Sequence, residues 1–144
     1  MKTIRFLLPV LLFLLSGTVC AEVSLDPRPD KVVEKSGVFN LKKKTYIFAD
    51  DSEGAKPAAR ALRDHCKRQL NKKLVDPHSL PDKGNRIAFY GDDRLSEGGY
   101  AIRMYKDLIE VRAASPAGFH SAVHILEQLI RTRQVPLVNV DGQP

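Results

Sequence analysis

Hydrophobic and polar residues alternate along two neighbouring stretches in the second half of the chain. Every second residue is apolar from Tyr100 to Met104, and the alternation returns from Ile109 to Ala113. A period of two residues is typical of a half-buried strand, and only a tight connection at Lys106-Asp107 separates the two stretches. The pattern therefore predicts a β-hairpin.

From Ser115 onward the hydrophobic period becomes helical. Ser115 can accept a hydrogen bond as the N-cap, and Pro116 suits the first helical position because no N–H is needed there. The apolar residues that share one helical face are Phe119, Ala122, Val123, Leu126, Leu129 and Ile130. We expect Arg131 and Arg133 at the C-terminal end, where the helix dipole favours cations, and a last strand from Val135 to Val140.

The first half of the chain predicts further strands and a second helix. Val32-Val33 and residues 38–41 lie on either side of Gly37 and indicate a short hairpin, and Thr45–Ala49 indicates another strand. A helix is expected from Glu53 to Leu74, with an apolar stripe made of Ala55, Ala58 or Ala59, Leu62, Cys66 and Leu70.

Pro57 fits that helix only within its first turn. After a loop, the almost continuously apolar stretch Ile87–Tyr90 is typical of an interior strand. Together the elements predict an α+β fold, with a mixed, largely antiparallel sheet of about five to seven strands and two helices packed on one face.

Residues 1–21 have the features of a signal peptide. Lys2 and Arg5 precede an apolar run that is shorter than the roughly 20 residues of a membrane-spanning helix, and small residues follow. We expect cleavage before Glu22, a periplasmic or secreted domain of residues 22–144, and no stable membrane span after cleavage.

Lipidation of Cys20 is the alternative, and it would tether the domain to a membrane surface. Gly17 and Val19 fit a lipoprotein peptidase poorly, so free export is favoured. Cleavage leaves Cys66 as the one cysteine, which excludes an internal disulfide, and its place on the apolar face of its helix predicts burial.

The chain is mildly basic, with 23 Lys and Arg against 17 Asp and Glu. Loss of Lys2 and Arg5 would leave a net charge of about +4, which suits weak attraction to anionic glycans or lipid headgroups. The predicted first helix carries the basic residues Lys56, Arg60, Arg63, Lys67, Lys72 and Lys73. No aromatic residue accompanies them for stacking on bases, so we expect a solvated face and no nucleic-acid partner.

His120 and His124 are four residues apart on the predicted second helix and could share a metal ion, with Glu127 on the next turn. The zinc-protease form of this spacing needs a glutamate after the first histidine, where Ser121 stands. We therefore expect two surface histidines and no metal site. A metal-dependent hydrolase is the weakest of the alternatives.

Two aspartate pairs, Asp50-Asp51 and Asp92-Asp93, each follow a predicted strand. We expect them to end these strands, and Asp50-Asp51 also to cap the helix that follows, because neither pair has the oxygen-rich spacing of a calcium loop. Gly98-Gly99 does not open a helix, and the chain has neither a nucleophile elbow nor a cysteine with a placed histidine. No catalytic, cofactor-binding or metal-binding residue is therefore predicted, and no cofactor.

Six short motifs follow one another along the chain, namely Pro27-x-Pro29-x-x-Val32, Gly37-x-Phe39-x-Leu41, Glu97-Gly98-Gly99-Tyr100-x-Ile102, Ile109-x-Val111-x-Ala113-x-x-Pro116-Ala117-Gly118-Phe119, Leu126-x-Gln128-Leu129 and Val135-Pro136-x-Val138-x-Val140-Asp141. Their order and spacing resemble the accessory domain that precedes the catalytic barrel in family 20 glycoside hydrolases, the β-N-acetylhexosaminidases. Similar accessory domains also precede catalytic barrels in some other glycosidase families.

The resemblance implies a non-catalytic domain that packs beside a (β/α)8 barrel. In that family the barrel carries an Asp-Glu pair, and the acetamido group of the substrate acts as nucleophile. This chain contains no Asp-Glu dipeptide, and its residues 141–144 are similar to the junction with the barrel. We therefore expect the catalytic barrel to lie outside the chain, and no catalytic residue transfers to it.

The leading hypothesis is an exported accessory domain that packs against or orients a glycosidase barrel in amino-sugar glycan degradation and is inactive alone. The barrel could belong to the same parent chain or to a separate one. The alternative is a stand-alone periplasmic or secreted glycan-binding module. The absence of tryptophan and the small number of aromatic residues argue against the alternative, because sugar-binding platforms favour flat apolar rings.

Overall fold

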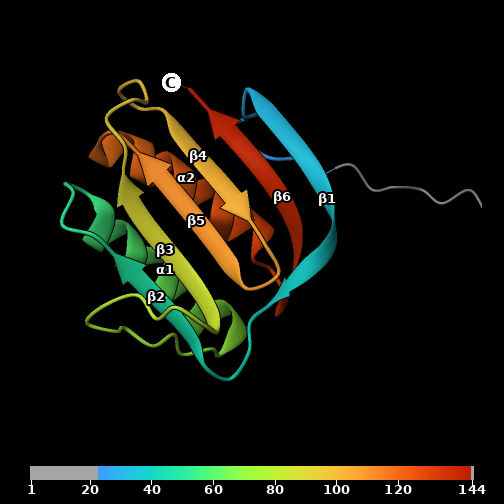
Figure 1. Ribbon diagram of the computed structural model, residues 1–144. Helices are drawn as coiled ribbons and strands as arrows, with labels where there is room; N and C mark the ends of the chain where they lie inside the picture. Colours follow the sequence, from blue (N-terminus) through green and yellow to red (C-terminus); the bar gives the residue numbers. More distant parts are fainter. Residues whose placement is uncertain (1–22, 144) are drawn as a thin grey trace, which may run out of the picture.

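The computed structural model describes residues 23–143, so the predicted signal peptide and the Cys20 alternative lie outside the described residues. Within this range six strands form one mixed sheet, in the order β1-β6-β4-β5-β3-β2 (Figure 1). The strands are β1 (Lys31–Asn40), β2 (Thr45–Ala49), β3 (Asn85–Gly91), β4 (Tyr100–Met104), β5 (Leu108–Ala113) and β6 (Gln134–Gly142). β2, β3 and β5 run parallel, whereas β4 is antiparallel to β5 and β6, and β1 is antiparallel to β6.

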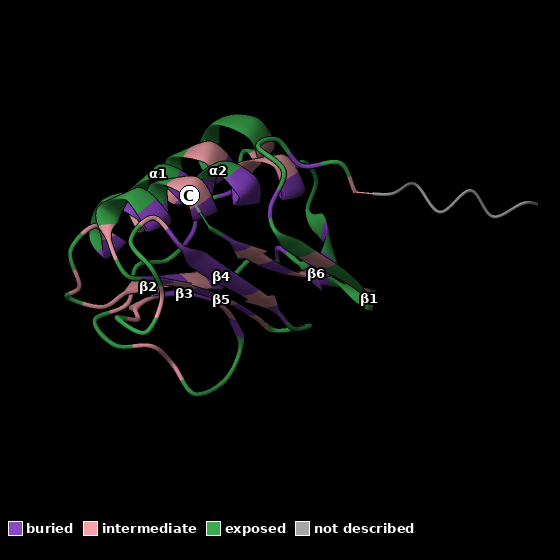
Figure 2. Ribbon diagram, turned by 90° about the horizontal axis from the view of Figure 1, so that it is seen from above, coloured by how far each residue is buried: buried purple, intermediate pink, exposed green. Residues whose placement is uncertain are grey.

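Two helices, α1 (Ala55–Leu70) and α2 (Pro116–Leu129), cover one face of this sheet (Figure 2). The predicted fold class is thereby confirmed, including the hairpin of β4 and β5 and the interior position of β3. As predicted, α2 begins at Pro116, and the hydroxyl of Ser115 accepts a hydrogen bond from the backbone N–H of Gly118. None of the helices among residues 23–143 combines the length and apolarity that crossing a membrane requires.

The hydrophobic core lies between the helices and the sheet. Phe89 and Phe119 meet there, with their ring centroids 6.3 Å apart, and Cys66 is buried on the inner side of α1 as predicted. Burial of large aromatic and aliphatic side chains supplies the main driving force for joining the two layers. The fully buried side chains of largest volume include Phe39, Leu62, Ile102, Ile125 and Leu126.

The predicted hairpin around Gly37 is wrong. Residues 31–40 form a single long strand that pairs with β6 on both sides of an irregularity between Glu34 and Val38. Gly37 has a φ of 103°, a backbone conformation that glycine adopts at little cost. The positive φ therefore accommodates a bulge within the strand and does not reverse the chain.

The predicted end of the first helix at Leu74 is also wrong. Asn71 has the left-handed φ of 49°, and the backbone N–H of Lys72 donates to the carbonyl oxygen of Cys66 at 3.1 Å, which is typical of a helix C-terminus. Lys72 and Lys73 therefore lie beyond α1, and Leu74 is buried outside the helix.

The two arginines that follow α2 have different partners. Arg131 Nε donates to the carbonyl oxygen of Gln128 at 3.0 Å, which confirms its predicted role at the C-terminal end of the helix. Arg133 Nη2 instead approaches the carbonyl oxygen of Leu70, the last residue of α1, at 3.5 Å. One arginine thus caps its own helix, and the other joins the ends of both helices.

Candidate functional site

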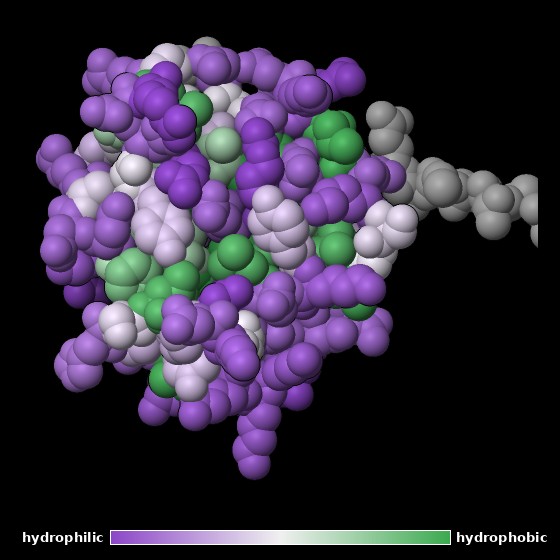
Figure 3. All heavy atoms as spheres, viewed as in Figure 1, coloured by the Kyte–Doolittle hydropathy of each residue, from purple (hydrophilic) through white to green (hydrophobic). Residues whose placement is uncertain are grey.

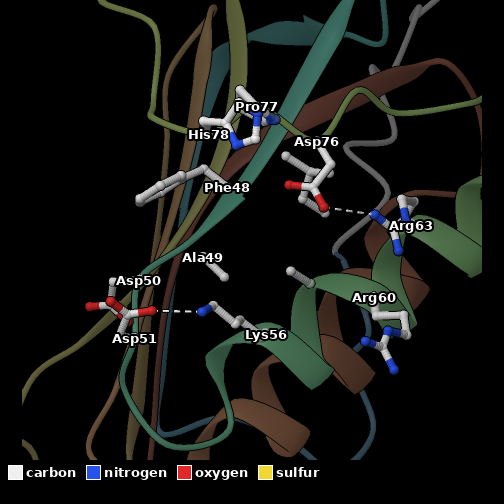
Figure 4. A pocket seen from close by; sticks show the side chains of 12 residues that line it. Phe48, Ala49, Asp50, Asp51, Lys56, Arg60, Arg63, Asp76, Pro77 and His78 are labelled. Atoms are coloured by element: carbon white, nitrogen blue, oxygen red, sulfur yellow. Dashed lines mark hydrogen bonds and ion pairs between the residues drawn. The ribbon is translucent and has the colours of Figure 1, made fainter.

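A hollow of about 460 Å³ opens between β2, the first half of α1 and the loop at Asp76–His78 (Figure 4). Two ion pairs line it: Lys56 Nζ lies 2.6 Å from Asp51 Oδ1, and Arg63 Nη1 lies 3.1 Å from Asp76 Oδ2. The Asp51 side chain is 96% exposed, so water solvates the first pair. Exposed, paired carboxylates of this kind are poorly suited to general acid–base catalysis, which needs a group whose pKa is shifted by burial or by like charge.

Asp50 lies at the edge of this hollow and joins the carboxyl ends of β2 and β3. Its carboxylate accepts hydrogen bonds from the backbone N–H and the hydroxyl of Ser52 and, at 2.9 Å, from the backbone N–H of Gly91. Partial burial opposes ionisation, but these bonds and the positive charge of Arg112 together lower the pKa of Asp50. The ionised Asp50 side chain therefore links the end of β2 to the end of β3.

The predicted capping role of Asp50-Asp51 is not what the structure contains. The N-cap of α1 is Gly54, in a left-handed conformation, and no side chain caps this terminus. A Cβ atom at Gly54 would lie 2.6 Å from the Cα of Pro116, so the two helices begin in close contact. Glycine satisfies both demands at this position, because it allows positive φ and leaves room for the neighbouring proline.

In the second aspartate pair, Asp92 is bound by Arg94. Nε and Nη2 of Arg94 donate to the two oxygens of the Asp92 carboxylate at 2.9 and 2.8 Å. The Arg94 guanidinium lowers the pKa of Asp92 to about 2. Asp92 is consequently ionised at neutral pH, and it ends β3 as a structural aspartate.

The structure places His120 and His124 on the exposed surface of α2 and leaves Glu127 half-buried. Within residues 23–143, no three or more side chains of histidine, cysteine, aspartate or glutamate converge on a point where they could bind a metal ion. The thiol of Cys66 is a buried ionisable group, and burial raises its pKa to about 11. A thiol in this state is a weak nucleophile at neutral pH.

The face of the sheet opposite the helices is mostly hydrophilic, with pale and hydrophobic patches between the charged side chains (Figure 3). Arg103 pairs with Asp141 across β4 and β6, with Nη2 and Oδ1 2.7 Å apart. The guanidinium of Arg112 lies 5.2 Å from the centre of the Tyr90 ring, which is a cation–π contact. Because Arg112 stacks over it, Tyr90 offers little free ring surface for a sugar.

Sequence reasoning missed one arrangement of charged residues. It assigned Lys72 and Lys73 to a helix face and Arg133 to the end of the second helix, whereas all three lie near the lysines between β1 and β2. The run Lys42–Lys44 was the available signal. A local pattern could not show that three distant segments meet.

Comparison with solved structures shows that the fold occurs in family 20 enzymes. An exo-β-N-acetylglucosaminidase from Vibrio harveyi has a TM-score of 0.70 and 21% sequence identity, with 82% of this chain and 18% of that chain covered. A β-N-acetylhexosaminidase from Bacteroides fragilis has a TM-score of 0.64 and 22% identity, with 82% and 24% covered. An N-acetyl-β-hexosaminidase from Streptomyces plicatus has a TM-score of 0.67 and 20% identity, with 82% and 26% covered.

The chain therefore spans about a quarter or less of the length of these similar proteins. No curated protein matches the sequence. The family model described as glycosyl hydrolase family 20, domain 2, matches residues 22–141, which is nearly the whole of the described domain. This match shows that the chain belongs to the protein family described as glycosyl hydrolase family 20, domain 2.

Proposed function

We propose that the protein is a non-catalytic accessory domain that packs against a glycosidase barrel during the degradation of amino-sugar glycans. The observation that carries the proposal is the match of residues 22–141 to domain 2 of the family, together with the small share of each similar enzyme that the chain covers. The side chains support it as well. Asp50 and Asp92 are ionised and hydrogen bonded, and Asp51 is exposed in an ion pair.

The outer surface of the helices is the best candidate for contact with the barrel. A groove of about 480 Å³ runs between the first turns of α1 and α2, and small apolar side chains line most of it, among them Pro57, Ala61, Pro116 and Val123. Exposed small residues allow the backbone of a partner to approach closely. The opposite face of the sheet is less suitable, because its arginines are already paired and their desolvation would cost free energy.

We also propose that the domain acts outside the cytoplasm, in the periplasm or the medium. The support is the sequence of residues 1–21, with its basic start, apolar run and small residues. Export would bring the domain to the compartment where extracellular glycans are found.

The proposal is tested by purifying the protein from its native cells with an affinity tag placed directly after Glu22. We expect hydrolysis of 4-nitrophenyl N-acetyl-β-glucosaminide to elute with the tagged protein, on the same polypeptide or on a bound one. Substitution Ala61→Glu places a charge in the groove and should reduce the activity that elutes, whereas Lys31→Glu, on the exposed part of β1, should not. Elution of the pure tagged protein without this activity would contradict the proposal.

A stand-alone glycan-binding module is the second candidate. The half-buried ring of Phe48, with its centroid 6.1 Å from that of Tyr90, favours it, because no cation–π contact covers the Phe48 ring among the described residues. Calorimetric titration with chitohexaose separates the two: saturable binding that is lost in a Phe48→Ala variant would favour the module, and no heat of binding would favour the accessory domain.

A further inference from the structure

Three distant segments of the chain meet at one end of the sheet, next to the loop between β1 and β2 (Figure 1). The backbone N–H of Leu41 donates to the carbonyl oxygen of Arg133 at 2.7 Å, and that of Val75 donates to Thr45 at 2.9 Å. The Arg133 side chain in turn reaches Leu70 at the end of α1. Residues 41–45, 67–75 and 130–135 therefore form one continuous surface, which we name the cationic end.

The charge of this surface is of one sign. The cationic end contains nine of the 23 Lys and Arg residues and none of the 17 Asp and Glu residues. None of the nine forms an ion pair with a carboxylate of the described residues, whereas six cations elsewhere do so. The nine comprise six lysines and three arginines, namely Lys42, Lys43, Lys44, Lys67, Arg68, Lys72, Lys73, Arg131 and Arg133.

Lys72 is the least exposed cation of the cationic end, and Arg133 and Lys43 from the two other segments lie near it. The residue is only 6% exposed, and no described side chain or backbone group forms a hydrogen bond or an ion pair with its ammonium group. That nitrogen is not among the fully buried polar atoms, so the aliphatic part of the side chain is buried and the charge opens to solvent. Burial, and then the charges of Arg133 and Lys43, lower the pKa of Lys72.

The positive charges of Arg133 and Lys43 disfavour the charged form of the neighbouring Lys72, and a bound anion would offset this repulsion. A hollow of about 510 Å³, bordered by Lys43, Lys73 and Val75, lies on the same surface and has room for an anionic group. The carboxylate at the rim of this hollow, Asp76, is already paired with Arg63. The cations extend over three segments, so a ligand with several spaced negative charges would contact more of them than a single small anion.

We propose that the cationic end binds an acidic polysaccharide, through carboxylate, sulfate or phosphate groups spaced along the polymer. A nucleic acid fits less well, because the three segments contain no aromatic residue that could stack on bases. A membrane also fits less well, because Val75 is the one exposed large apolar residue that these segments contribute. The choice of a glycan as the polyanion rests on the proposed function.

The test is the affinity of the purified protein for dextran sulfate and polygalacturonate, with neutral dextran and phosphatidylglycerol vesicles as the other probes. We expect binding to the two acidic polymers that weakens as the salt concentration rises, and no binding to neutral dextran. In the triple variant Lys43→Gln, Lys73→Gln and Arg133→Gln, the affinity should fall by roughly tenfold or more. Circular dichroism checks that each variant folds.

The matched control removes three exposed cations away from the cationic end, in the variant Lys31→Gln, Lys56→Gln and Arg60→Gln. Its affinity should stay within about threefold of the parent protein. An equal loss in both variants would mean that net charge alone drives binding and would overturn the proposal. Failure to bind either acidic polymer, or tighter binding to the vesicles, would also overturn it. Because the purified protein is used, the result is independent of the co-elution experiment with the barrel.

Discussion

Substitution Gly118→Ala sets two opposite effects against each other in the first turn of α2. A Cβ atom at Gly118 would lie 2.3 Å from the carbonyl oxygen of Gly99 and 3.0 Å from the Cβ of Ala113. An ordinary carbon–oxygen contact is about 3.3 Å or longer, so the backbone would have to separate by about 1 Å. The first atom is backbone, which cannot rotate away as a flexible side chain could.

The steric effect should outweigh the gain in helix propensity. Replacing glycine by alanine in a helix stabilises it by about 1 kcal/mol, whereas overpacking costs about 1–3 kcal/mol and more where the backbone must move. We expect a net destabilisation of about 2 kcal/mol, which corresponds to a melting temperature lower by about 8 °C for a domain of this size.

Urea unfolding followed by circular dichroism measures this change. The matched control is Ala117→Gly, at the exposed neighbouring position, which should cost up to about 1 kcal/mol through helix propensity alone. If Gly118→Ala were as stable as the parent protein or more stable, the close approach of α2 to the loop before β4 would be refuted.

Three further predictions concern ionisable groups. The folded-state pKa values of Asp50 and Asp92 lie below the unfolded values, so their contribution to stability is present above about pH 4 and is lost as the pH falls toward 2. Urea unfolding at a series of pH values should therefore show less acid destabilisation in the variants Asp50→Asn and Asp92→Asn than in the parent protein. Cys66 should resist iodoacetamide at pH 8 in the native protein and react in urea, because burial raises its pKa to about 11, and rapid native labelling would contradict its burial. Lys72→Met should raise the melting temperature and weaken binding to dextran sulfate, whereas a lower melting temperature without loss of binding would show that the ammonium group is structural.

Local sequence signals predicted the second half of the domain well. Ser115 and Pro116 mark the start of α2 through groups within three residues of each other, and the alternation in β4 and β5 depends on nearby residues. Such signals need no knowledge of distant partners. The same local reasoning failed at Gly37, where the chain continues as one strand because β6, from the far end of the chain, pairs with both of its halves.

The polar arrangements depended on contacts that no local pattern contains. Asp50 was expected to cap a helix, but its partner Gly91 lies 41 residues away on the neighbouring strand. The cationic end likewise requires Lys43, Lys72 and Arg133 to meet, which follows from the sheet order and from the end of α1 at Leu70. Hydrophobic periodicity was sufficient to predict the fold class, whereas these side-chain contacts required the structure.

The claim that the chemistry of glycan cleavage lies outside residues 23–143 is tested most directly by assaying the purified protein alone with 4-nitrophenyl N-acetyl-β-glucosaminide. The account predicts no release of nitrophenol above the rate of the buffer, even at high protein concentration. Turnover that follows the protein through successive purification steps, and that is lost on unfolding in urea, would contradict it.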